Sequence, residues 1–267
     1  MIPVGDSPKT TIVPWVNYGL ILANVVAFLY LLGLSGAWPA GSRQQYNEIR
    51  DQAAGPCYGF PAPPTERDRF ICEWSLQPKE FFDNLQGRSD VASPDRRQVF
   101  LSIVTSMFIH GGWLHIVGNM LFLWVFGDNV EERLGHAGYL TFYLVGGIVA
   151  AMVQGLSNAA SVVPIVGASG AVAAVLGAYI VYYPRATVNV VIPFFVLIFI
   201  PIPIPAVVMI GLWFAQNLIG GFATVGSATT PNEGVAWFAH VGGFLWGMAT
   251  VWLFLRHIRR PPPRWQE

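Results

Sequence analysis

The sequence predicts an all-α membrane protein, a bundle of six transmembrane helices with a long extracytoplasmic first loop. Two observations predict this fold. Of the 267 residues, 54% are hydrophobic and only 11% are charged, which is more apolar surface than an ordinary soluble core hides. Long runs without Asp, Glu, Lys or Arg also alternate with short charged connectors, as the roughly 20-residue length of a membrane-crossing helix requires.

The six predicted spans follow one another along the chain. They are residues 14–34, 113–127 with an apolar lead-in from Val99, 138–156, 164–183, 203–222 and 235–255. The segment 188–200 is also apolar, but it is short and contains Pro193, so we expect an interfacial segment or a broken lead-in there. A seventh span is the alternative at that place, and a cleaved signal peptide is the alternative to the first span.

The Lys and Arg residues predict the orientation of the bundle. With six spans, the tail 1–13, the second and fourth connectors and the basic tail 256–267 share one side of the membrane. The cationic residues on that side are Lys9, Arg133, Arg185, Arg256, Arg259, Arg260 and Arg264. The third and fifth connectors, on the other side, contain no Lys or Arg. Both termini are therefore expected to be cytoplasmic, in a bacterial inner (cell) membrane.

The long loop 35–98 precedes a core of five further helices, residues 99–255, and lies outside in this orientation. It contains both cysteines, Cys57 and Cys72, in a Pro-rich patch. In an oxidising compartment a disulfide between them would contribute about 3 kcal/mol. Two free thiols are the alternative.

A few polar side chains interrupt the otherwise apolar spans, and such residues are costly in hydrocarbon unless they face the interior and have a function. The proposed spans contain no Asp, Glu, Lys or Arg, and the residues that stand out are His110, His115, Asn119, Ser169 and His240. Because the second, fourth and sixth spans all start outside, His115, Ser169 and His240 should lie at one membrane depth. We expect His110 to be structural.

Helical spacing brings two of these residues closer. Ser169, Ala173 and Gly177 form a stripe of small side chains on the fourth span. His240, Gly243 and Gly247 form another on the sixth. Such faces allow two membrane helices to approach closely, so the serine and the histidine should come within hydrogen-bond reach.

The chemistry that fits these residues is acyl transfer. His240 could take the proton of Ser169, which makes a nucleophile–base pair. The backbone N–H of Ser169, with His115 and Asn119, could stabilise the developing oxyanion. Since no carboxylate lies in the spans, the pair would be a dyad and not a Ser-His-Asp triad.

Three motifs, "FIHGGWLHIVGNMLFLWVFGDNVEERLG", "GASG" and "HVGGFLWG", resemble those of the rhomboid family of intramembrane serine proteases over about residues 99–255. The resemblance implies a six-helix bundle that cleaves transmembrane substrates near the extracytoplasmic membrane boundary. It also implies that Ser169 is the nucleophile, that His240 is the general base, and that His115 and Asn119 stabilise the oxyanion.

Four glycines are expected to give structural support by keeping the approach to the site open or by close helix packing: Gly167, Gly170, Gly243 and Gly247. The resemblance further implies support from the Gly–Glu–Gly pattern of Gly127, Glu131 and Gly135. We expect Glu131 to bind backbone or Arg133 and to hold the connector after the second span. His136, in the same connector, is expected to be solvated.

The sequence departs from the pattern of some family members in two ways. Leu101 and Ser102 stand where those members have Trp-Arg. Ala173 stands where they have an aromatic residue that packs on the catalytic imidazole, so Trp237 or Phe244 is expected to orient His240 here.

Other functions fit less well. A zinc protease would need His-Glu-x-x-His, and an aspartyl protease would need two Asp residues within the membrane; the sequence has neither. A transporter would more commonly show charged residues or inverted repeats along its pathway. No basic stripe indicates nucleic acid, and no cofactor is expected.

Transmembrane proteins and the lipid bilayer are the expected partners, with the Pro- and Gly-containing fifth span as the route of substrate entry. A non-catalytic relative that binds or escorts membrane proteins is the alternative.

Overall fold

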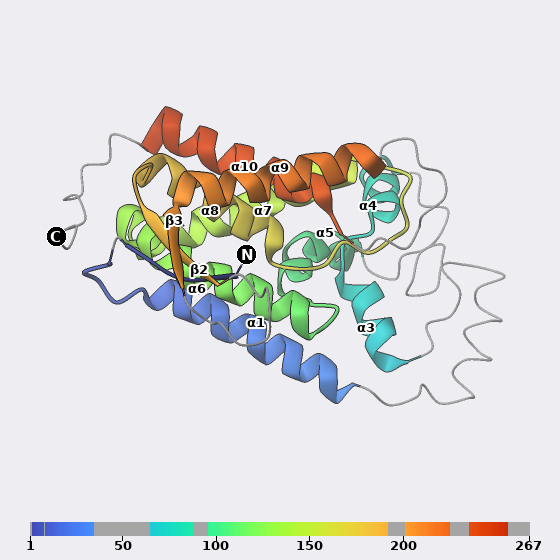
Figure 1. Ribbon diagram of the computed structural model, residues 1–267. Helices are drawn as coiled ribbons and strands as arrows, with labels where there is room; N and C mark the ends of the chain where they lie inside the picture. The colour runs from blue at the N-terminus through green and yellow to red at the C-terminus, as the bar shows by residue number, and fades with distance from the viewer. Residues whose placement is uncertain are drawn as a thin grey trace.

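The structure is a computed structural model that describes residues 2–7, 9–34, 65–87, 96–191, 201–224 and 235–255. The helices are α1 (Trp15–Gly33), α3 (Glu66–Trp74), α4 (Pro78–Leu85), α5 (Arg96–Thr105), α6 (Trp113–Leu134), α7 (His136–Ser157), α8 (Ser169–Tyr182), α9 (Ala206–Thr224) and α10 (Trp237–Thr250). The turns η1 (Ser106–Phe108) and η2 (Val251–Leu255) extend α5 and α10. In Figure 1, α8 runs through the middle of the molecule, between α1 and α6 below and α9 and α10 above.

Within the described residues, four helices are long and apolar enough to cross a membrane alone: α1, α7, α9 and α10 with its η2 extension. A fifth candidate combines residues 97–108, which include most of α5, with α6 across a bend of 78°, as one broken span or a re-entrant segment. The sixth helix, α8, has only 14 residues and is buried along nearly all its length. A helix surrounded by protein does not itself have to match the bilayer. The predicted all-α membrane bundle is thereby confirmed, with four to five candidate membrane crossings in the described residues.

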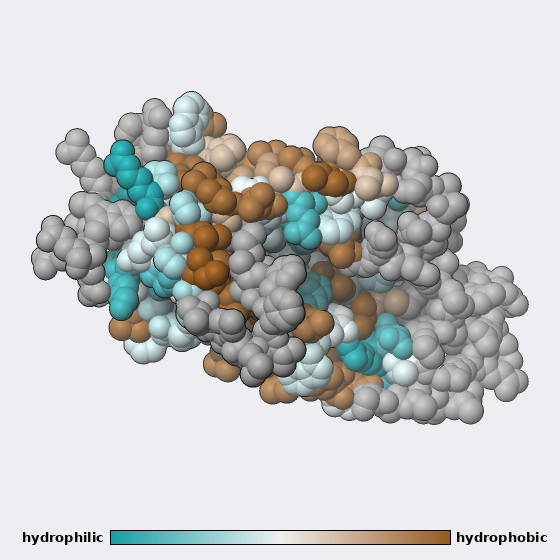
Figure 2. Space-filling model, viewed as in Figure 1, coloured by the Kyte–Doolittle hydropathy of each residue, from teal (hydrophilic) through white to brown (hydrophobic). Residues whose placement is uncertain are grey.

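The outward faces of the bundle are apolar, as contact with lipid requires. Trp15, Leu22 and Val26 of α1 are exposed, as are Leu212 and Ile219 of α9. Figure 2 shows hydrophobic residues gathered over α9 and α10 at the top of the molecule.

Several helix ends differ from the predicted ones because particular backbone positions decide them. Helix α6 continues beyond residue 127 to Leu134 and ends where Gly135 takes a φ of 72°. Helix α8 begins at Ser169 and not at residue 164, because Gly167 has a φ of 114°, which no helix accommodates. In the segment before it, Ile165 pairs with Leu76 as an isolated β-bridge.

The described part of the predicted loop 35–98 is largely helical, which corrects the expectation of a plain loop. Helix α4 begins with Pro78, whose fixed φ suits a first helical turn. Phe82 of this helix packs on α7 at Gly155, where an added Cβ would lie 3.3 Å from its ring. Cys72, in α3, is disulfide-bonded; Cys57 lies outside the described residues, so the predicted pairing stays a prediction.

A three-stranded antiparallel sheet, which the all-α prediction missed, closes one end of the bundle. Its strands are β1 (Ile2–Asp6), β2 (Thr187–Val191) and β3 (Ile202–Pro205), in the order β1-β2-β3. The tail before the first span and the start of the segment 188–200 are therefore strands, and α9 begins at Ala206 instead of residue 203. Val188 and Val190 are buried while Thr187 and Asn189 are exposed, which is the two-residue period of a half-buried strand. We call this the sheet end of the bundle.

The sheet is attached to the helices through a partly buried carboxylate. Asp6 Oδ2 accepts hydrogen bonds from Tyr179 Oη of α8 at 2.5 Å and from Asn129 Nδ2 of α6 at 2.9 Å. Burial raises the pKa of Asp6 to about 7, against the effect of the Tyr179 hydrogen bond, and the nearby charge of Asp128 adds to the increase.

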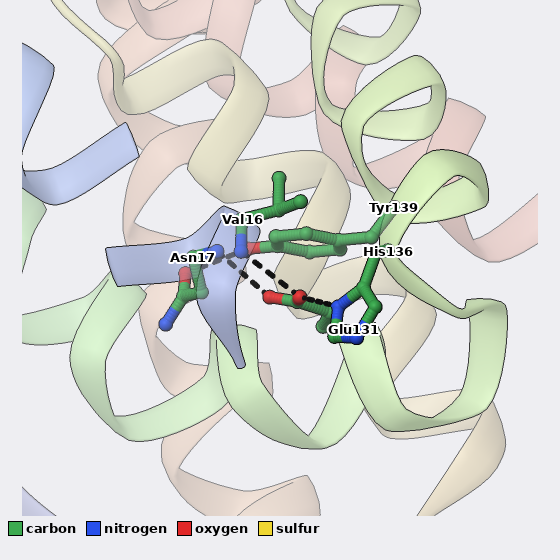
Figure 3. Close-up of polar contacts among 5 residues, drawn as sticks. All are labelled: Val16, Asn17, Glu131, His136 and Tyr139. Atoms are coloured by element: carbon green, nitrogen blue, oxygen red, sulfur yellow. Dashed lines mark hydrogen bonds and ion pairs between the residues drawn. The ribbon is translucent and has the colours of Figure 1, made fainter. Parts of the chain in front are cut away.

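The start of α1 is capped by a residue from another helix. Pro14, at the N-cap, has no side chain that can accept a hydrogen bond. Instead Glu131, fully buried at the end of α6, accepts from Val16 N at 3.0 Å and from Asn17 N at 2.7 Å (Figure 3). Its Oε1 also lies 2.5 Å from His136 Nδ1, so the half-exposed His136 is paired and not simply solvated. Glu131 thus satisfies two amides that α1 would otherwise leave without partners.

The two glycines of the Gly–Glu–Gly pattern allow this contact. At Gly127 an added Cβ would lie 2.2 Å from Asn17 Oδ1, which itself accepts a hydrogen bond from Tyr139 Oη at 2.9 Å. Gly135 takes the positive φ that turns the chain from α6 into α7. The pattern therefore joins three helices at the sheet end.

Candidate functional site

Ser169 and His240 meet at the end of the bundle opposite the sheet, which we call the site end. Ser169 is the first residue of α8, and His240 lies in the first turn of α10. His240 Nε2 is 2.7 Å from Ser169 Oγ, a hydrogen-bond distance. Residues 71 positions apart are thus in direct contact.

Close packing of α8 on α10 produces this contact. An added Cβ at Gly243 would lie 2.2 Å from Gly170 O, and one at Gly247 would lie 2.1 Å from Ala174 O. At Gly177 the corresponding distance to Phe244 O is 2.1 Å. Only glycine allows the two backbones to approach this closely.

The small-residue face of α8 differs from the predicted one by one position. Gly170, Ala174 and Gly177 contact α10, whereas the expected stripe began with Ser169 and Ala173. A shift of one residue turns a helix by about 100°. Ser169 therefore lies at the margin of the α8–α10 contact, where its hydroxyl reaches the histidine.

His115 and Asn119 of α6 lie against the backbone just before the serine. An added Cβ at Gly167 would be 2.6 Å from His115 Nε2 and 3.7 Å from Asn119 Nδ2. Asn119 is buried, and its Nδ2 has no hydrogen-bond partner among the described residues. A buried donor without a partner costs about 1–3 kcal/mol, so this amide weakens the fold while remaining available to a bound acceptor.

His110 holds the same segment from the other side. It is fully buried, and its Nε2 accepts a hydrogen bond from Ala168 N at 3.4 Å. Its ring packs edge-on against His115, with the centroids 5.0 Å apart. These contacts agree with the structural role expected for His110. In the described ranges, no three His, Cys, Asp or Glu side chains converge in a way that could hold a metal ion.

A small cavity of about 20 Å³ lies beside Ser169, bounded by Ser106, Gly147, Ala150 and Gly167 among others. A space of this size holds one water molecule, and the hydroxyls of Ser106 and Ser169 give it polar partners. The site therefore has room for the co-substrate of a hydrolysis next to the serine.

The connector between α3 and α4 holds the chain that leads into α8. Ile165 N donates to Leu76 O at 2.8 Å, and Gln77 Nε2 donates to Val162 O at 2.7 Å. On α5, Leu101 is exposed and Ser102 is buried with its hydroxyl bonded to Val99 O. The described part of 35–98 thus packs against the site end and is hydrogen-bonded to it.

Two polar residues at the site were missed by the sequence analysis. Asn217 of α9 places its Oδ1 2.5 Å from His240 Nδ1. Gln154 of α7 accepts from Ala239 N at 3.1 Å and so caps α10, whose N-cap residue Ala236 makes no side-chain bond. Both stand within apolar spans, and the rule that singled out His240 would have found them.

The rings around His240 are partly those expected. Trp237 packs edge-on at 6.5 Å between centroids, and Trp213 of α9 lies at 5.8 Å with a 36° tilt. Phe244 instead stacks on Phe214 at 4.4 Å. The aromatic contact with His240 that Ala173 cannot make is thus supplied mainly by Trp213 of α9.

Comparison with known proteins gives one consistent result. Residues 97–257 match the Rhomboid domain model. The chain is 29% identical over 168 residues to "Rhomboid protein 1, mitochondrial" of Saccharomyces cerevisiae, covering 61% of this chain and 44% of that protein. It is 32% identical over 123 residues to "Presenilin-associated rhomboid-like protein A, mitochondrial" of Danio rerio, covering 45% and 31%.

A third relative, "Rhomboid-like protease 5" of Toxoplasma gondii, is 26% identical over 168 residues, which cover 61% of this chain and 17% of that protein. The chain thus spans less than half the length of each of these relatives. The domain model covers more than half of the chain, from α5 to beyond α10. The chain is therefore a multi-pass membrane protein that belongs to the rhomboid family.

Proposed function

We propose that this protein is an intramembrane serine endopeptidase that hydrolyses peptide bonds of transmembrane substrates near the membrane boundary at its site end. The observation that carries the proposal is the 2.7 Å separation of Ser169 Oγ and His240 Nε2 inside a membrane bundle. A hydroxyl becomes an effective nucleophile when a positioned base can take its proton. The same contact favours catalysis over the alternative of a binding or escort protein, which has no need of it.

The reaction has two halves. In the first, Ser169 Oγ bonds to the substrate carbonyl carbon while His240 Nε2 takes the hydroxyl proton. The tetrahedral intermediate then collapses, the C–N bond breaks, and His240 passes the proton to the leaving amine. In the second half, water attacks the acyl-serine with His240 again as base, which releases the carboxylic acid and restores Ser169.

The negative charge of the intermediate would be stabilised by three donors. The Ser169 amide lies at the N-terminus of α8, where the helix dipole adds to its effect. His115 and Asn119 come from α6, against the backbone of Gly167. The unpartnered Nδ2 of Asn119 supports this role, because it has a hydrogen bond to gain when the oxyanion forms.

The orientation remains the one that the Lys and Arg distribution favours, with the sheet end cytoplasmic and the site end outside. A bacterial membrane finds no support among the relatives, two of which are named as mitochondrial. Labelling of cysteines introduced in 256–267, from one side of sealed vesicles, tests the orientation. Entry of the substrate beside α9 belongs to the same proposal, and a covalent link between α9 and α6 that left cleavage intact would exclude it.

The test is cleavage of a model transmembrane substrate by the purified full chain in detergent and in liposomes. Ser169→Ala and His240→Ala should each reduce the rate by about 10⁴-fold or more while folding is retained. Ser157→Ala, an exposed serine at the end of α7, is the matched control and should cleave as the wild type does. Full activity of Ser169→Ala would refute the mechanism, and a folded wild type inert on several substrates would favour the binding alternative.

A further inference from the structure

We infer that Asn217 of α9 is a positioning residue for His240, so that the site is complete only while α9 is packed on α10. The inference rests on the proposed function, because it assigns a role toward the proposed base. The observation behind it is the 2.5 Å contact between Asn217 Oδ1 and His240 Nδ1 on the side of the ring away from Ser169.

The amide of Asn217 has its orientation fixed by its own helix. Its Nδ2 donates to Trp213 O at 2.7 Å, an oxygen that can only accept. Oδ1 therefore faces His240, and because Oδ1 is also only an acceptor, Nδ1 must carry the hydrogen. The other ring nitrogen, Nε2, is then unprotonated and has its lone pair available for the Ser169 hydroxyl.

This arrangement corresponds to a Ser-His-Asn triad instead of the dyad predicted from sequence. In serine hydrolases the third group holds the imidazole in the productive tautomer and orientation. A neutral amide can do both, although it stabilises the imidazolium less than a carboxylate would. Asn217 is buried, and so the contact is shielded from competition by water.

A purely structural role would be that of an interhelical hydrogen bond, which contributes about 0.6–2 kcal/mol in membrane proteins. Two features favour positioning over this reading. Asn217 contacts the second ring nitrogen of the proposed base, and not a residue without a role in the proposed reaction. Trp213, one turn earlier on α9, also packs on the same imidazole at 5.8 Å, so a single helix supplies both the acceptor and the ring.

The position of α9 therefore determines the orientation of His240, the proposed base. The helix is held at its start by Ala206 N, which donates to Ala186 O at 2.8 Å. Near its other end Gly220 lies against Trp237, where an added Cβ would be 2.6 Å from the ring. Movement of the middle of α9 away from α10 would withdraw Asn217 and Trp213 together. A substrate that displaces α9 would then react only after α9 has returned.

The experiment compares Asn217→Ala and Asn217→Asp with Gln216→Ala, the exposed neighbour on the same helix. Asn217→Ala should lower kcat by about 10- to 100-fold with KM within about twofold, as expected when a histidine loses the group that orients it. Gln216→Ala should change neither constant. Asn217→Asp should keep an acceptor at the same place and retain most of kcat at alkaline pH.

The pH–rate profile separates positioning from packing. A carboxylate beside Nδ1 favours the protonated ring, so the acidic limb of the Asn217→Asp profile should move upward by about one pH unit or more. An unchanged profile, or a loss of activity in Asn217→Ala that only follows its loss of thermal stability, would overturn the inference. If Asn217→Ala does not fold, the isosteric Asn217→Asp variant decides alone. Failure of the proposed function itself would show differently, as undiminished cleavage by Ser169→Ala.

Discussion

The two ends of the bundle use their polar side chains differently. At the sheet end Glu131 binds two amides of α1 and the His136 ring, and Asp6 binds Tyr179 and Asn129. At the site end the buried donor Asn119 Nδ2 has no partner in the described part of the chain. Each end also contains a glycine at a positive φ, Gly167 at the site end and Gly135 at the sheet end.

The contacts that stabilise the fold and the residues proposed to react therefore lie at opposite ends of one bundle. Satisfied buried groups stabilise and specify the fold, whereas unsatisfied donors and unusual backbone angles cost about 1–3 kcal/mol each. A site that must bind a developing charge keeps such groups unpaired until the substrate arrives. Substitutions at the site end should therefore change activity more than stability, and substitutions at the sheet end should do the reverse.

Apart from substitution of Ser169 and His240 themselves, the largest effect is expected at the site end, from Gly167→Ala. The new Cβ would lie 2.6 Å from His115 Nε2, at a φ that L-residues rarely adopt. Displacing the imidazole should reduce cleavage by about 100-fold or more, the size seen when one oxyanion donor is lost. Cleavage kinetics and thermal unfolding of the same preparation measure both consequences. Gly118→Ala, on α6 with open space around it, is the control, and equal activity of the two variants would contradict the prediction.

A smaller effect, on stability, is expected at the sheet end from Glu131→Ala. Removing the carboxylate leaves Val16 N and Asn17 N without their acceptor, so the free energy of unfolding should fall by about 2–4 kcal/mol. The kcat of the folded fraction should change little. Denaturant titration in detergent gives the comparison with Glu132→Ala, whose carboxylate binds Thr11 at an exposed position and should cost about 1 kcal/mol. A loss of kcat in Glu131→Ala without a loss of stability would contradict the expected difference between the two ends.

The smallest effect is a pH dependence at Asp6. Its pKa is raised to about 7 in the fold, from 3.8, so the native state holds the proton more tightly than the unfolded chain does. The stability that this provides is fully present below about pH 4 and is lost as the pH rises through 7. Thermal unfolding should accordingly show a protein that is about 2–3 kcal/mol more stable at pH 5 than at pH 8. Asp6→Asn should remove this difference, and a wild type more stable at pH 8 would show that the sign is wrong.

Hydropathy and motif spacing predicted the membrane bundle and the residues of the site because both depend on local composition. Apolar runs near the length of a membrane crossing are visible without a partner. Ser169, His240, His115 and Asn119 were found because polar groups are conspicuous in such runs. The same rule would have pointed to Asn217 and Gln154, which stand in spans that otherwise contain few polar side chains.

The sheet and the capping contacts were not predictable in the same way. Residues 2–6 and 187–191 form strands because they pair with each other across most of the chain, and an isolated five-residue segment has no such preference. Glu131 acts on α1, more than 100 positions away. The single-residue error in the face of α8 likewise reflects which neighbour the helix meets, and not its own small-residue pattern.

The sequence by itself determined that this protein lies in the membrane as a helical bundle and which polar residues its interior contains, since burial in hydrocarbon constrains every residue of a span separately. The tertiary structure alone decided which of these residues meet: that Gly170 faces Gly243, that Asn217 reaches His240, and that Asp6 joins the sheet to α8. Hydrogen bonds and close backbone contacts act over about 3–4 Å between distant segments. Such pairings exist only once the helices have packed.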